Sequence, residues 1–223
     1  MLKDIMLGMK LIRYSYGFKT NIASMIIFPV IGGLMMAAAE ADSFMFGGIY
    51  LYMSFVMFVQ MSNMMLTVQI VSAAPRRKLF EQTFPDAVML ITALLWYLVL
   101  TLLVAVFINI SPNLREEYTV SLVIVALFMA VLQIYIGVCY KFFWLASIMF
   151  FTVFTYMLIK GREILIGFIL KYVGMNFFEN FTIGLIIIVV ACLFSMFLRK
   201  LFYKRPMSKM AMGAIVRQAM KQV

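Results

Sequence analysis

The side chains that most often carry out chemistry are scarce in this sequence, which excludes several mechanisms. The chain has 223 residues and no histidine, so Ser-His triads, HExxH zinc sites and bis-His haem are excluded. No acidic residue lies mid-way along an apolar run, so a proton-coupled carrier lacks its usual group. Cys139 and Cys192 lie in apolar runs and are expected to be packing residues, not a disulfide. We expect no metal site and no cofactor on this chain.

The densest polar motif is S-A-A-P-R-R-K-L-F-E-Q-T-F-P-D-A-V, from Ser72 to Val88 between two apolar runs. Pro75 can occupy the first turn of a short helix, and Pro85 can close it. Its basic residues could reach lipid phosphates or the carboxylates of a partner. The segment predicts either a docking helix or only a positively charged anchor. The residues that would dock are Pro75, Arg76, Arg77, Lys78, Leu79, Phe80, Glu81, Phe84 and Pro85.

A methionine-rich face follows in the second apolar run, where Tyr50 and four methionines recur at helical spacing. Methionine is flexible and polarizable, so such a face adapts to varied apolar ligands. Three amides lie at membrane depth, where they are costly unless paired or wetted. Helix packing or lipid contact explains any single one of these residues as well. The candidate substrate-pathway residues are Tyr50, Met53, Met57, Gln60, Met61, Asn63, Met64 and Gln133.

A proline and two glycines in the first apolar run form a candidate hinge. Pro29 lies beside Gly32 and Gly33, and proline is a common cause of helix kinks. A kinked helix could be a moving part, although kinks also occur without a function.

The composition shows which elements must position these residues. The chain is 65% hydrophobic and 13% charged, with a mean hydropathy of +1.05, whereas soluble domains are about 45–50% apolar and about 25% charged. We predict an all-α integral membrane protein, because isolated strands cannot satisfy their backbone groups in lipid. A span needs about 20 apolar residues. The six predicted spans are Ile22–Ala39, Phe46–Leu66, Val88–Ile110, Thr119–Tyr140, Phe142–Ile159 and Phe181–Leu198.

The charges predict the orientation of these spans. With both termini cytoplasmic, fifteen of the nineteen lysines and arginines lie on the inner side, as the positive-inside rule requires. The excess of +10 is therefore a topology signal and a match for anionic lipids, and we expect no nucleic-acid partner. The same orientation places Lys160–Asn180 outside as a re-entrant or interfacial hairpin, or else as an unusually apolar loop.

The segments at the two ends are predicted to lie at the inner membrane surface. Ile5, Met9, Ile12 and Tyr16 form an apolar stripe, which favours an interfacial helix over a disordered basic tail for residues 1–20. Residues 199–223 form a basic tail that would anchor on the membrane surface.

With its interfacial helix, six spans, minimal outer loops and a Pro-Arg-rich inner loop ending in Phe84-Pro85, the chain resembles a permease subunit of ABC exporters of the ABC-2 type. The resemblance implies that the inner loop forms a coupling helix on a separate cytoplasmic ATPase subunit, which holds ATP and magnesium. It implies a dimer with a second permease copy or paralogue in a bacterial cytoplasmic membrane. Compact members of this kind resemble exporters of amphipathic peptides. No GxxxxGK[ST] motif occurs in the chain.

This resemblance gives one permease domain over residues 1–223 that is not itself an enzyme. Its parts are the interfacial helix at 1–20, spans one and two at 22–66, the coupling loop at 67–87, spans three to five at 88–159, the outer hairpin at 160–180, span six at 181–198 and the tail at 199–223. The alternatives are a non-transport membrane scaffold or sensor subunit, an intramembrane enzyme and a channel.

Overall fold

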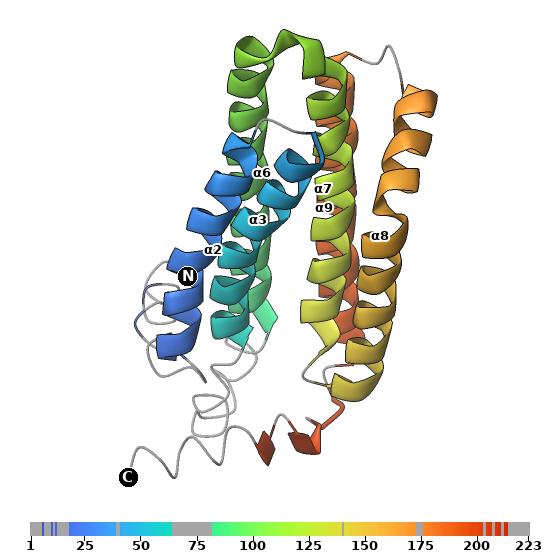
Figure 1. Cartoon of the computed structure of the whole chain (residues 1–223). Helices are drawn as coiled ribbons and strands as arrows, with labels where there is room; N and C mark the ends of the chain where they lie inside the picture. The colour runs from blue at the N-terminus through green and yellow to red at the C-terminus, as the bar shows by residue number, and fades with distance from the viewer. Residues whose placement is uncertain are drawn as a thin grey trace.

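A computed structural model describes residues 6, 10, 12, 18–38, 41–63, 82–139, 141–172, 176–202, 204–206, 208–210 and 212–213. Within these ranges the chain is all-α, as expected. Six long helices alternate in direction (Figure 1). They are α2 (Phe18–Ala37), α3 (Ala41–Asn63), α6 (Phe84–Ile110), α7 (Arg115–Val138), α8 (Phe143–Tyr172) and α9 (Phe177–Leu201), with the short 3-10 helix η3 (Pro112–Leu114) between α6 and α7.

Each predicted span falls within or close to one of these helices, and apart from the end of α8 the bounds differ by at most five residues. By length and apolar composition, four helical segments of the described chain could cross a membrane: Phe18–Ala37, Phe84–Ile110, Pro112–Val138 and Phe177–Leu201. Helices of this length and composition are what a multi-pass membrane protein requires. That all six helices cross stays a prediction.

The helix ends follow from local sequence. Pro85 stands at the start of α6, with Asp86 in its first turn, where a carboxylate interacts favourably with the helix dipole. α6 ends at Ile110, and Pro112 then begins η3, as a proline that cannot continue the helix should. At the start of α9, the carboxylate of Glu179 accepts a hydrogen bond from the backbone N–H of Asn176 at 3.1 Å, which satisfies one of the donors that a helix start exposes.

The centre of the bundle is α7. It packs against α3, α6, α8 and α9, whereas α2 packs on α3 at one edge and α8 packs on α7 at the other (Figure 1). Of the apolar window of α7, 78% of the residues are buried, against 11% for α2. We call the end where α6 begins and α9 ends the base of the bundle, and the end where α6 passes into α7 the top.

The outward faces of the peripheral helices are apolar. Large side chains such as Leu34 on α2, Leu102 on α6, Ile159 on α8 and Val190 on α9 are 58–72% exposed. Monomeric soluble proteins rarely expose apolar patches of this extent. The distribution therefore fits a chain whose solvent is lipid.

The turn between α7 and α8 lies near Cys139 and Lys141, where the fourth predicted span passes into the fifth. The backbone N–H groups of Cys139 and Lys141 donate to Tyr135 and Val138, at 2.9 and 3.0 Å. α8 then begins at Phe143.

The structure corrects the prediction for residues 160–180. A hairpin with two short arms was expected, but residues 160–172 continue α8, which has 30 residues, and α9 begins at Phe177. The charges there do not end the helix, because Lys160 and Glu163 form an ion pair one turn apart at 2.7 Å, with side chains 45% and 68% exposed. Gly167, on which a Cβ would meet nothing within 4 Å, costs only about 1 kcal/mol in a helix.

Several predicted segments lie mainly outside the described residues, namely most of the N-terminal interfacial helix, the loop at 64–81 and most of the tail after residue 202. At the described positions of the first segment, Ile12 on the predicted apolar stripe is 5% exposed, whereas Lys10, off the stripe, is exposed.

Candidate functional site

The candidate site lies at the base of the bundle, where the predicted docking loop enters α6. Pro75 to Glu81 lie outside the described residues. Of the predicted docking set, the structure therefore places Phe84 and Pro85. Both are buried, Phe84 to 3% exposure, and the preceding Gln82 is 7% exposed. The C-terminal end of the predicted loop is thus packed inside the bundle and is not exposed on its surface.

Directly after Pro85, Asp86 pairs with Arg199 in the last turn of α9. The carboxylate Oδ1 lies 3.2 Å from Nη1 of the guanidinium, and the side chains are 10% and 1% exposed. The distance is that of an ion pair, but the angles are not those of a hydrogen bond. Within the described residues, none of the three nitrogens of Arg199 has a hydrogen-bond acceptor. The pair therefore joins α6 to α9 by charge, in a place where water is largely excluded.

The sequence analysis did not identify this pair, although a signal was present. Asp86 comes two residues before the third predicted span, and Arg199 comes directly after the sixth. In an alternating bundle, the start of an odd span and the end of an even span lie on the same side. Because the two residues carry opposite charges and lie on the same side, their positions along the spans are enough to predict an ion pair.

Aromatic and basic side chains join the end of α9 to the α7–α8 turn. The guanidinium of Arg205 lies 4.1 Å from the ring centroid of Phe142, and the Phe142 and Phe202 rings meet edge to face at 4.7 Å. The Nζ of Lys141 donates a hydrogen bond to the backbone carbonyl of Arg205 at 2.7 Å. The base end of α9 is therefore fixed to the turn beside it.

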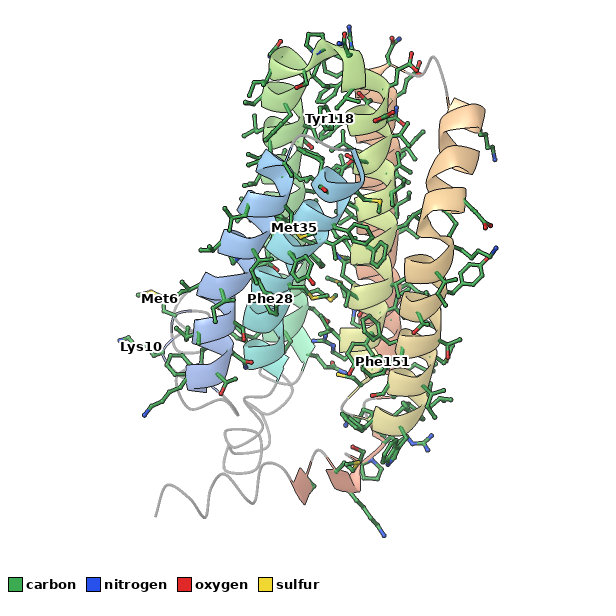
Figure 2. The ribbon with its side chains drawn as sticks, viewed as in Figure 1. Met6, Lys10, Phe28, Met35, Tyr118 and Phe151 are labelled. Atoms are coloured by element: carbon green, nitrogen blue, oxygen red, sulfur yellow. The ribbon has the colours of Figure 1, made fainter. Side chains whose placement is uncertain are left out.

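The predicted methionine-rich face is placed only in part. Tyr50 is 37% exposed and its ring lies 6.1 Å from that of Phe28 on α2, in the region where α2 meets α3 (Figure 2). Met53 is half-buried against the core. The backbones of residues 57, 60, 61 and 63 belong to α3, but the side chains of Met57, Gln60, Met61 and Asn63, and all of Met64, lie outside the described residues.

Gln133 is enclosed at the contact of three helices. It is 0% exposed. Its Nε2 donates to the hydroxyl of Tyr52 on α3 at 3.5 Å, and its Oε1 accepts from the thiol of Cys192 on α9 at 3.4 Å. Its backbone carbonyl accepts from the hydroxyl of Ser195 at 2.9 Å. In this conformation the amide is buried and paired within the bundle.

Glycines allow close approach at two helix pairs. A Cβ on Gly32 would lie 2.7 Å from the carbonyl oxygen of Gly47, so the two residues bring α2 against α3. A Cβ on Gly137 would collide with the Ser195 side chain of α9. Gly33, in contrast, faces open space. Of the predicted hinge, Pro29 lies inside α2, Gly32 is a packing residue and Gly33 has no neighbour.

The top of the bundle is closed by aromatic side chains. The ring of Phe44 on α3 lies 5.0 Å from Phe107 on α6 and 4.7 Å from Tyr118 on α7, and Tyr118 stands near the upper end of α7 (Figure 2). A shallow hollow of about 400 Å³ is lined by Phe178, Glu179, Thr182 and Ile183 near the start of α9. It is far along α9 from Arg199.

The cysteines and acidic residues offer no metal centre in the part of the chain that the structure describes, where no three potential ligands lie together. Cys139 and Cys192 are both buried and form no disulfide within the described residues, as expected of packing residues.

A scan against protein-family models and searches of curated proteins and of solved structures find no match to this chain. The function therefore has to be argued from the residues and the geometry alone.

Proposed function

We propose that this chain is the transmembrane subunit of an ATP-driven exporter of the ABC-2 type. In this proposal all six helices cross a bacterial cytoplasmic membrane, the base of the bundle and both termini are cytoplasmic, and residues 67–87 form the coupling loop. A separate ATPase subunit holds ATP and magnesium, and a second permease copy or paralogue completes the pathway. The substrate is an amphipathic or hydrophobic molecule, with an amphipathic peptide as the first class to test.

One observation carries the proposal. The loop that resembles a coupling helix ends in Phe84 and Pro85, which are buried in the bundle, and the next residue is ion-paired to α9. A force applied to this loop would therefore reach α6 directly, at the point where α6 meets α9. A loop that served only as a positively charged anchor needs no such attachment.

The rest of the molecule is compatible with this role. α7 forms a central packing helix, and the peripheral helices present apolar faces that lipid or a second copy can cover. The sequence contains no phosphate-binding GxxxxGK[ST] motif, so uphill transport by this chain requires an ATPase on another chain.

Alanine replacement of Leu79, Phe80 and Glu81 tests the docking role. We expect the triple variant to lose co-purification with the ABC ATPase subunit that the wild-type chain retains, because it removes the apolar contact and the acid of the loop. The measurement is the amount of ATPase retained on the tagged full-length chain in detergent. A matched control replaces Asn113 and Glu116 near the top of the bundle, where both are exposed.

Full retention of the ATPase by the loop variant would contradict the coupling role. If no ATPase is retained by the wild-type chain either, the non-transport scaffold or sensor subunit becomes the better account.

A further inference from the structure

α6 is attached to the rest of the bundle at three levels that differ in kind. At the top, η3 joins it to α7, and Phe107 packs against the rings of Phe44 and Tyr118. In the middle, the Tyr97 hydroxyl donates to the backbone carbonyl of Phe181 at 3.1 Å. At the base, the polar attachment is the ion pair of Asp86 with Arg199.

The middle attachment is close-packed. The rings of Tyr97 and Phe181 stack at 5.7 Å with an interplanar angle of 13°, and Tyr97 is 0% exposed. Gly184 makes room for it, because a Cβ there would overlap the phenol. Interlocking of this kind fixes the distance between α6 and α9 at this level.

The base attachment is the weakest of the three. Burying two charges is costly, and their attraction repays that cost only when further hydrogen bonds satisfy both groups. Within the described residues, the three nitrogens of Arg199 and Oδ1 of Asp86 have none. Phe84 and Met89 are buried at the same end. Because lipid is as apolar as these side chains, separating helices in a membrane loses little hydrophobic free energy.

α9 and α7 cannot separate as easily at this end. Ser195 and Cys192 of α9 both donate to Gln133 of α7, and Gly137 lets the two helices touch at Ser195. Phe202 packs on Phe142 at the α7–α8 turn. The base end of α6, where the predicted coupling loop ends, is joined to α9 by the Asp86–Arg199 ion pair, and α6 also packs on α3.

We propose that α6 is a lever, with Asp86 and Arg199 as the positioning pair that holds its base end against α9 and is separated when the loop is displaced. The pivot is the Tyr97 contact, eleven residues or about 17 Å along the helix from Asp86. Separation breaks no covalent bond, and each charge gains water or lipid headgroups at the membrane surface. The inference rests on the proposed function for the source of the force, whereas the lever itself is a property of this chain.

The test measures the distance between spin labels at the base ends of α6 and α9 by double electron–electron resonance. Labels are placed on Ile91→Cys and Leu201→Cys in the full chain in lipid nanodiscs, with Cys139 and Cys192 replaced by serine. Ile91 and Leu201 are 55% and 59% exposed, so the labels face outward. Neither ATPase nor substrate is present.

Removing the positioning pair should populate a longer distance. Asp86→Asn leaves Arg199 buried without a counter-charge and can fail to fold. The deciding variant is therefore the double replacement Asp86→Leu with Arg199→Met, which leaves no charge behind. We expect it to raise the population of the longer distance about tenfold, equivalent to about 1.4 kcal/mol. The control is Glu163→Gln, which breaks the exposed pair on α8 and should leave the distribution unchanged.

A double variant whose distance distribution matches that of the wild-type chain would overturn the lever, because the ion pair would then hold nothing that moves. The result separates the two proposals. If the double variant shows the longer distance but the wild-type chain binds no ATPase, the lever is supported and the exporter role is contradicted. If the complex exports substrate but the double variant keeps the wild-type distance, the exporter role is supported and the lever is contradicted.

Discussion

At the scale of single residues, the polar groups inside the bundle fall into two kinds. The amide of Gln133 donates one hydrogen bond to Tyr52 and accepts one from Cys192, so its burial is compensated at both ends. The guanidinium of Arg199 is equally buried but has one ion-pair partner and no hydrogen bond in the described part of the chain. The first kind joins helices permanently, and the second kind is suited to a contact that opens.

Gln133→Leu distinguishes packing from a role in the substrate pathway. Each interhelical hydrogen bond in a membrane is worth about 0.6 kcal/mol and at most about 1.7. We therefore expect the variant to unfold in detergent with a free energy lower by about 1–2 kcal/mol. Asn109→Ala is the control, because its exposed amide bonds only within α6 and its loss should change little.

A Gln133→Leu chain that keeps its full stability but loses substrate handling would reverse this assignment. The amide would then have to face the pathway in another conformation.

The sequence identified Gln133 as a costly polar group but not its purpose. The tyrosine and the cysteine that pair with it come from runs 81 and 59 residues away. Only the packing of α3 and α9 on α7 brings them together. The docking role of Pro75–Glu81 stays a prediction, because these residues lie outside the described part of the chain.

At the scale of elements, the helices follow the hydrophobic runs closely, and the exception has a physical cause. Lys160, Arg162 and Glu163 indicate an end to the fifth span, but a helix does not end where the membrane does. Spacing of three residues lets Lys160 and Glu163 pair on the helix surface. α8 therefore continues to a length of about 45 Å, beyond a hydrocarbon core of about 30 Å.

Two neighbouring glycines of α2 offer a matched test of how this edge helix is held. Gly32→Leu should lower the free energy of unfolding by roughly 1–3 kcal/mol, because its side chain meets the Gly47 backbone. Gly33→Leu, which points into open space, should be neutral or stabilising by up to about 1 kcal/mol, because leucine is the better helix former.

The measurement is unfolding of both variants in the same detergent. Equal effects at the two positions would mean that α2 does not pack on α3 through this face. Both glycines were predicted to belong to a hinge. The sequence shows that glycine is flexible, but it does not show which of the two faces a neighbouring helix.

At the scale of the whole molecule, α7 is the central helix and α9 is hydrogen-bonded to it. The base of α6, where the predicted coupling loop ends, is joined to α9 by an ion pair. The class of the fold follows from composition, because so apolar a chain has few ways to satisfy its backbone in lipid. The ATPase, the second permease copy and the substrate cannot be predicted from composition in this way. The predicted docking residues Pro75–Glu81 lie outside the described residues, and the proposed second copy and substrate are other molecules.

The exporter proposal requires that an ATPase drives this chain to move an amphipathic substrate. In liposomes that hold the full-length chain with the ABC ATPase subunit that it retains, a synthetic amphipathic helical peptide should stimulate ATP hydrolysis several-fold and accumulate across the bilayer in an ATP-dependent manner. Both effects should be lost in the Leu79, Phe80 and Glu81 alanine variant. Hydrolysis and peptide distribution that are unchanged by the presence of this chain would contradict the exporter proposal.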